Sequence, residues 1–125
     1  MPQNFGDLKV WQRAIDLTVC IYELTQSFPR EELYGLTSQL RRASVSIASN
    51  IAEGRGRLNS GEFRQFLGIA LGSTFEVQTQ LVVARRLKIA NAKNIDEAVT
   101  LTDEVSRMLT SFIQKLSSKA TKAKS

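Results

Sequence analysis

Apolar residues recur at intervals of three and four along almost the whole chain, and this spacing constrains the fold more than any other feature. Such spacing places the apolar side chains on one side of an α-helix, whereas a half-buried β-strand would alternate apolar and polar residues. No sustained alternation bounded by turn residues occurs in the sequence. The sequence therefore predicts an all-α protein.

Short polar connections divide the apolar pattern into four segments, which favours an antiparallel four-helix bundle. A chain of 125 residues is long enough for one domain and too short for two. We expect this domain to span residues 1–117 and residues 118–125 to form a basic flexible tail, because the tail has too little apolar content to order itself. The helices are predicted at about residues 8–26, 36–55, 60–89 and 95–116.

Polar residues that can cap helices precede three of these segments. Asp7 is expected to cap the first helix, because its carboxylate can accept hydrogen bonds from the first free backbone N–H groups. Asn59 followed by Glu62, and Asn94 followed by Glu97, have the spacing of a capping box. The two pairs predict the starts of the third and fourth helices.

The helix at residues 36–55 carries two apolar faces. One is the stripe that faces the bundle, and the other contains the small or apolar residues Val45, Ala48 and Ala52. This is more apolar surface than a peripheral helix of a monomeric bundle needs to bury. We therefore expect Val45, Ala48 and Ala52 to form an interface between subunits.

Asn50 falls on the bundle-facing stripe of the same helix. A buried amide without a partner would cost about 1 to 3 kcal/mol. The amide is therefore expected to bond to Glu53, to Gln80 or to a backbone group, and to act as a structural pin.

The net charge of +5 is unevenly distributed. Residues 1–35 contain more acids than bases, whereas residues 36–59 contain four arginines and one acid, Glu53. Such asymmetry favours a polyanion or an acidic protein surface as partner, although a solvated surface is the common alternative. An antiparallel bundle would gather the cations at two ends, with Arg55, Arg57 and Arg64 at one and Arg41, Arg42, Arg85, Arg86 and Lys88 at the other.

Residues that commonly perform catalysis are sparse. The sequence has no histidine, which removes the most frequent general base and metal ligand, and Cys20 lies in an apolar helical context. A metal-dependent nuclease would need converging acids, yet Glu53, Glu62 and Glu76 are scattered over two helices. The sequence therefore predicts no enzymatic activity, no metal site and no cofactor.

The stretch EGRGR, residues 53–57, superficially resembles a phosphate-binding loop. Such loops follow a strand and open a helix, whereas this one closes a predicted helix. A helix end followed by a turn is the favoured interpretation, with the glycines carrying Arg55 and Arg57 around the corner.

Location is predicted from two features. The amino terminus lacks the basic and apolar layout of a secretory signal, and a single cysteine cannot form an internal disulfide, so we expect a cytoplasmic protein. No stretch of eighteen uncharged apolar residues occurs, so no membrane partner is expected.

Three segments of the chain are FGDLKVWQRAIDL, IYELTQSFPREELYGLTSQLRRASVSIASNIAEGRGR and EFRQFLGIALGSTFEVQTQLVVARRL. They resemble a bacterial family of four-helix-bundle proteins encoded in intervening sequences of 23S ribosomal RNA genes. The resemblance covers about residues 5–90. It implies a four-helix bundle, and members are generally without assigned enzymatic activity. Family members also resemble the accessory protein of diversity-generating retroelements, a pentameric barrel that binds nucleic acid and a reverse transcriptase, which implies a homopentamer here.

Charge placement and resemblance together predict a ring-forming, non-enzymatic bundle that binds nucleic acid, with rRNA-associated structured RNA as the expected ligand. Aromatic residues are not interleaved with the cations, so contacts to phosphate and shape are expected. The alternative is a protein-interaction scaffold or accessory subunit, for example for a reverse transcriptase. The expected nucleic-acid contacts are Arg41, Arg42, Arg55, Arg57, Arg64, Arg85, Arg86 and Lys88.

Overall fold

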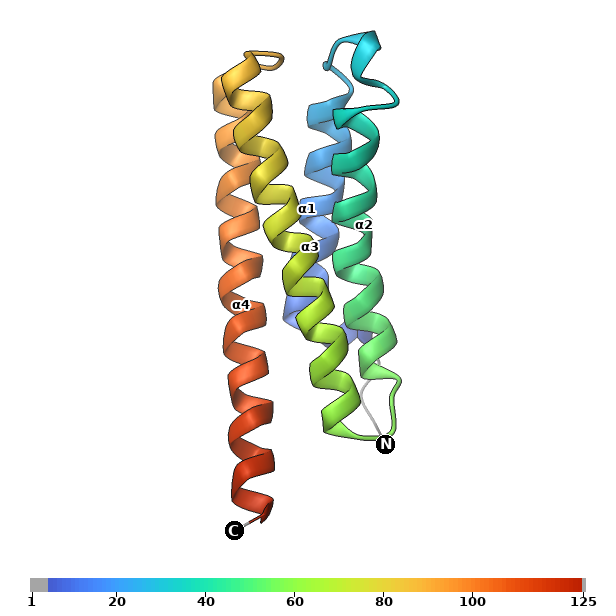
Figure 1. Ribbon diagram of the computed structural model, residues 1–125, viewed down its shortest axis with the longest axis vertical. Coiled ribbons are helices and arrows are strands. Elements are labelled where there is room, and N and C mark those ends of the chain that lie inside the picture. Colours follow the sequence, from blue (N-terminus) through green and yellow to red (C-terminus); the bar gives the residue numbers. More distant parts are fainter. Residues whose placement is uncertain (1–4, 125) are drawn as a thin grey trace.

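The computed structural model describes residues 5–124, except for the side chains of Asp7 and of residues 119–124. No strand occurs in this part of the chain, and the all-α prediction is confirmed. Figure 1 shows four long helices packed side by side, each running opposite to the one before it. They are α1 (Lys9–Thr25), α2 (Leu36–Arg55), α3 (Ser60–Leu87) and α4 (Ala92–Lys124), with two short 3-10 helices, η1 (Phe5–Asp7) and η2 (Arg30–Glu32).

The core lies between all four helices. Helix α2 packs mainly against α3, α3 packs against α4, and α1 contacts both α2 and α4. Fully burying one aliphatic side chain stabilises the folded state by about 1.5 to 3 kcal/mol, so this core is the main source of stability. The largest fully buried side chains are those of Leu17, Ile21, Leu40, Ile47, Ile51, Leu67, Leu81, Ile95 and Leu109.

The start of α3 is confirmed. Asn59 occupies the N-cap position, and its side-chain oxygen accepts a hydrogen bond from the backbone N–H of Glu62 at 2.8 Å. Because this N–H has no partner within the helix, the cap satisfies a donor that would otherwise be free.

The predicted start of α4 is wrong by one turn. Helix α4 begins at Ala92, and Asn94 lies within its first turn. The side-chain oxygen of Asn91 accepts from the backbone N–H of Lys93 at 2.8 Å. The correct cap is thus the earlier of two asparagines three residues apart, and the Asn94–Glu97 spacing was coincidental.

The end of α4 also differs from the prediction, whereas α1 begins within one residue of its predicted start. Helix α1 begins at Lys9 with Leu8 in the N-cap position and no side-chain cap, and the expected cap, the Asp7 side chain, lies outside the described residues. Helix α4 continues to Lys124, so the prediction that the helix gives way to a tail at residue 118 is wrong. Figure 1 shows these last turns extending past the α2–α3 turn.

Asn50 does not lie on the buried stripe of α2, which continues from Ile47 to Ile51. The Asn50 amide is half-buried and donates to the carbonyl of Ser46 at 2.8 Å and to its hydroxyl at 3.0 Å. The Ser46 hydroxyl lies 2.9 Å from that of Ser73 on α3. A backbone group is thus a partner of Asn50, which was one of the predicted options. Through Ser46 the hydrogen bonds continue to Ser73 and so link α2 to α3.

Ala48 does not lie on an outer face of α2. Its exposed fraction is 6%, and it belongs to the core of this chain. It lies one turn after Ser44, whose carbonyl accepts a hydrogen bond from Thr18 of α1 at 3.1 Å. The prediction that Ala48 contacts another subunit is therefore wrong, because α1 already covers this side of α2. Val45 is exposed and Ala52 is half-buried.

Helix α3 has an apolar outer side. By length and composition alone it could cross a membrane, although the core helices of soluble bundles meet the same criterion. One third of its most apolar window is buried. The exposed apolar side chains on α3 are those of Ile69, Phe75, Val82, Val83 and Leu87.

Candidate nucleic-acid interface

The end of α2 and the start of α3 lie in close contact. A Cβ atom on Gly54 would lie 2.6 Å from the Cβ of Phe66 and 3.0 Å from Cδ1 of Phe63, so only glycine fits here without a shift. Helix α2 ends one residue later, and the turn to α3 follows. The prediction that EGRGR ends a helix and forms a turn is confirmed. Arg55 and Arg57 are thereby placed beside the first turns of α3.

Aromatic rings of α3 lie under the arginines of this turn. The guanidinium carbon of Arg57 lies 4.5 Å from the ring centre of Phe66, and that of Arg55 lies 5.9 Å from the ring centre of Phe63. Arg57 also approaches Glu53, at 4.0 Å between Nη2 and Oε2. An exposed ion pair this long contributes little, so the donors of Arg57 remain available to an external anion. The buried Nε of Arg55 has no hydrogen-bond partner among the described atoms.

Arg64 lies in the second turn of α3 and is half-buried. Together with Arg55 and Arg57 it forms the surface that we call the turn patch. Two acids belong to this region, Glu53 and, in the first turn of α3, Glu62. Arginine binds phosphate well because its planar guanidinium can donate two parallel hydrogen bonds. The turn patch is thus suited to a phosphate backbone.

Arg41 is already engaged within the bundle. Its Nε donates to the hydroxyl of Thr25 at 2.9 Å, and its guanidinium carbon lies 4.6 Å from the ring centre of Tyr22 on α1. The side chain therefore fastens α2 to the last turn of α1. A role in binding an external anion would have to compete with these contacts.

The end of the bundle opposite the turn patch is mixed in charge. Arg85 of α3 forms an ion pair with Asp96 of α4. Arg86 is exposed, and Lys88 ends α3 with a left-handed backbone, φ 56°. Acids lie at this end as well, because η2, the end of α1 and the start of α4 are all located there. They are Glu23, Glu31, Glu32, Asp96 and Glu97.

A second basic pole, as predicted from the sequence, does not form at this mixed end. The end of α3 brings Arg85, Arg86 and Lys88 there, and α1, η2 and α4 bring carboxylates to the same end, so the cations are largely balanced. Arg42 lies in the second turn of α2. It is exposed and lines a hollow of about 370 Å³ between α2 and α3, which Glu76 and Gln80 also line.

Sequence reasoning missed two cations near the turn patch. Lys9 begins α1, and Lys115 lies late in α4, so the antiparallel order carries both toward the same end as the α2–α3 turn. Their positions follow from the helix order, and this signal could have been used. The turn patch thus belongs to a wider basic end of the bundle.

Cys20 lies away from the basic end, beside a hollow of about 240 Å³ that Glu23 and Glu97 also line. Burial raises the pKa of the Cys20 thiol, and the two carboxylates raise this pKa further. The thiol is therefore a poor nucleophile at neutral pH. Among the residues that the structure describes, no cluster of three potential ligands could hold a metal ion.

Comparison with known proteins places this bundle in a family. The family described as 23S rRNA-intervening sequence protein matches residues 6–111. The chain belongs to this family. The match ends within α4, so Lys115 and the last turns of that helix lie outside the part that this 23S rRNA-intervening sequence protein shares with the family.

A solved structure has the same fold. It is described as a protein of unknown function from the S23 ribosomal protein family of Bacteroides thetaiotaomicron, and the TM-score is 0.75 at 21% sequence identity. The similarity covers 83% of this chain and 97% of the other. At this identity the likeness establishes the fold. A search of curated proteins found no match to this sequence.

Proposed function

We propose that this 23S rRNA-intervening sequence protein is a non-enzymatic, cytoplasmic oligomer that binds structured RNA through the turn patch. One observation carries the proposal: Arg55 and Arg57 lie at the end of α2 and in the turn to α3, whose second turn carries Arg64. Among the described side chains, the one ion pair of these three arginines is the 4.0 Å approach of Glu53 to Arg57. Local excess of arginine over acid attracts phosphates, and releasing their counterions favours binding.

The contacts expected at the turn patch are to phosphates. Phe63 is buried, and Phe66 lies under the Arg57 guanidinium, so neither ring is free to stack on a base. Phosphate contacts position a protein on RNA without reading its sequence. We therefore expect recognition of a folded RNA by its shape, with little dependence on the sequence of paired regions.

Self-association is the second element of the proposal. Exposed apolar side chains on α3, including Ile69, Phe75 and Val83, and Val45 on α2 would be covered by a second copy of the chain. The family resemblance implies a ring of five. In such a ring the turn patch is repeated around the axis, so several weak phosphate contacts act together on one RNA.

The proposal is tested by fluorescence anisotropy with a labelled RNA hairpin at several salt concentrations. Wild type is expected to bind at low salt, with log affinity falling linearly against log salt concentration. The Arg57→Ala/Arg64→Ala double variant is expected to bind about tenfold more weakly and to reduce the salt slope by about 2 per protomer in contact. Arg55 is left intact, because its packing on Phe63 makes it a risk to folding.

The matched control is Arg86→Ala/Lys93→Ala, which removes two exposed cations from the mixed-charge end. Its affinity should stay within about twofold of wild type, since distant exposed charges are largely screened. Absence of hairpin binding at low salt, or equal loss in both double variants, would refute the proposal. The exposed apolar side of α3 would then favour a protein-interaction scaffold, for example for a reverse transcriptase.

A further inference from the structure

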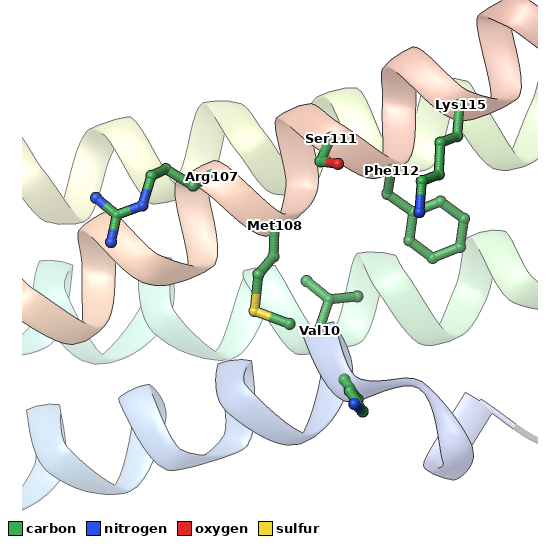
Figure 2. A pocket seen from close by; sticks show the side chains of 7 residues that line it. Val10, Arg107, Met108, Ser111, Phe112 and Lys115 are labelled. Atoms are coloured by element: carbon green, nitrogen blue, oxygen red, sulfur yellow. The ribbon is translucent and has the colours of Figure 1, made fainter.

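Another hollow surface lies between the start of α1 and the later half of α4. Its volume is about 440 Å³, and Figure 2 shows Arg107 and Lys115 at opposite ends of a row on α4, with Met108, Ser111 and Phe112 between them. It adjoins a hollow of about 410 Å³ that shares Ser111, Phe112 and Lys115 and reaches Ser118. We call the two hollows together the α1–α4 groove. The residues that line the first are Lys9, Val10, Arg107, Met108, Ser111, Phe112 and Lys115.

The floor of the α1–α4 groove is apolar. Val10 is buried, and Met108 and Phe112 are half-buried. The ring of Phe112 is fixed by an edge-to-face contact with Phe63 of α3, at 5.3 Å between ring centres. Figure 2 shows Met108 reaching from α4 toward Val10 of α1. The floor therefore offers preformed apolar surface, with a thioether and an aromatic ring that can pack against another ring.

The rim of the groove carries three cations, Lys9, Arg107 and Lys115. Within the side chains that the structure describes, Lys9, Arg107 and Lys115 form no ion pair. Glu104 lies one turn from Arg107, which helps to lower the pKa of its carboxyl without forming an ion pair with it. Its carboxylate oxygens accept two hydrogen bonds from Arg13. The positive charge of the rim is thus left for an external anion.

The apolar floor and the basic rim of the groove together restrict what can occupy it. A bare phosphate would leave the apolar floor in contact with water, and a neutral apolar molecule would bury cations without a partner, which is costly. A molecule that alternates flat apolar rings with anionic groups satisfies both. Arg107 and Lys115 are eight residues apart, about 12 Å along the helix, and the groove continues beyond Lys115, so an extended chain fits better than a single small anion.

We propose that the α1–α4 groove binds a single-stranded segment of RNA, with unpaired bases on Met108 and Phe112 and phosphates at Lys9, Arg107 and Lys115. The inference rests on the proposed RNA-binding function and adds a second site of different specificity. The turn patch holds phosphates of a folded RNA, whereas this groove takes bases that are not paired. Stacking tolerates any base, so the groove selects for unpaired structure and has little preference for sequence.

The test compares two neighbouring exposed residues of α4. Ser111 lines the groove and Thr110 does not, so Ser111→Glu places a carboxylate among the three cations while Thr110→Glu adds the same charge elsewhere on the same turn. With a labelled six-nucleotide single strand, Ser111→Glu is expected to weaken binding at least tenfold and Thr110→Glu less than twofold. An abasic strand with the same phosphates is expected to bind wild type at least fivefold more weakly.

A blunt RNA duplex, which has no unpaired base, separates this inference from the proposed function. The proposed function is supported if duplex binding is unchanged in Ser111→Glu and falls in Arg57→Ala/Arg64→Ala. The groove is supported as well if Ser111→Glu loses single-strand binding. If wild type and Ser111→Glu bind the single strand equally, and wild type binds the abasic strand as tightly as the intact strand, the inference about the groove is overturned. Duplex binding in the same experiment would leave the proposed function standing. If Ser111→Glu changes the mass measured by light scattering without changing single-strand binding, the groove is a subunit contact and the inference is wrong.

Discussion

Arg13 of α1 binds Glu104 of α4 through two hydrogen bonds, from Nε to Oε1 at 3.0 Å and from Nη2 to Oε2 at 2.6 Å. The remaining terminal nitrogen of Arg13 donates to Asp16 at 2.7 Å. One guanidinium thus ties the first helix to the last across the surface of the bundle. The hydrogen bonds from Arg13 hold the pKa of the Glu104 carboxyl below its usual value, while desolvation opposes this effect.

The Arg13–Glu104 pair predicts a pH-dependent contribution to stability. Because the pKa of Glu104 is lower in the folded than in the unfolded protein, the stabilisation is complete above the ordinary carboxyl pKa and disappears as the pH falls through the folded value. Wild type should therefore melt a few degrees above Glu104→Gln at neutral pH, and the difference should shrink as the pH is lowered through the folded pKa of Glu104. Thermal melts followed by circular dichroism measure this.

The control for that experiment is Glu53→Gln, which removes the 4.0 Å contact to Arg57. A pair this long and exposed should give no measurable difference from wild type at any pH. If the gap between wild type and Glu104→Gln is the same at pH 3 and pH 7, the Arg13–Glu104 bonds do not stabilise the bundle in the way described.

Gly54 predicts a second effect on stability. A methyl group at this position would lie 2.6 Å from the Cβ of Phe66, so Gly54→Ala must push α2 and α3 apart. We expect a loss of about 1 to 3 kcal/mol in the free energy of unfolding, measured by urea denaturation. At Gly68, on the same helix pair, nothing lies within 4 Å of the added methyl group, and Gly68→Ala should stabilise α3 by about 0.5 to 1 kcal/mol. Equal effects at the two positions would contradict the packing of the α2–α3 turn.

Much of the fold could be predicted because helix formation and burial follow a local pattern. The apolar residues of α3 from Phe63 through Leu67 to Leu81 are buried together because residues three and four apart share one side of any helix. Helix ends are less certain, because several polar residues near one boundary can serve as the cap. The one at Asn59 was predicted correctly, and the one at Asn91 was missed in favour of Asn94.

The candidate site could be predicted only in part, because charge depends on contacts between helices. Arg85 and Asp96 are eleven residues apart, yet they pair because α3 and α4 meet at the mixed-charge end. Ala48 failed as an interface residue for a similar reason. Its periodicity placed it beside the stripe of α2, but only the position of α1 decides that this side is covered.

The two asparagines near the start of α4 give a direct test of the helix boundary. Asn91→Ala removes the side chain that accepts from Lys93, so it should cost about 1 kcal/mol of stability. Asn94→Ala lies inside the first turn and should change stability by less than about 0.5 kcal/mol. Asn59→Ala, which removes the cap of α3, provides the reference loss. Urea denaturation of the three variants would rank them, and a larger loss at Asn94 than at Asn91 would restore the later boundary.

A charged residue in place of Ala48 is expected to destabilise the fold of the single chain. Since its exposed fraction is 6%, Ala48→Glu would place a carboxylate between α1 and α2 without a partner. We expect a loss of about 3 kcal/mol or more and a lower helical content in circular dichroism. Ser49→Glu, on the exposed neighbour, should stay within about 0.5 kcal/mol of wild type. A fully helical Ala48→Glu variant that differs only in oligomer mass would show that this side of α2 is open.

Val45 is the most exposed residue of the predicted interface, with an exposed fraction of 42%. If this side of α2 lies between protomers, Val45→Glu puts a carboxylate in an apolar contact, which favours dissociation because the charge keeps its water only in the free subunit. Light scattering should then report a lower mass, while circular dichroism stays that of a folded bundle. Thr110→Glu, on the exposed surface of α4, carries the same charge and should leave the mass unchanged. An unaltered mass for Val45→Glu would move the interface to the apolar side of α3, where Phe75→Glu is the next variant to measure.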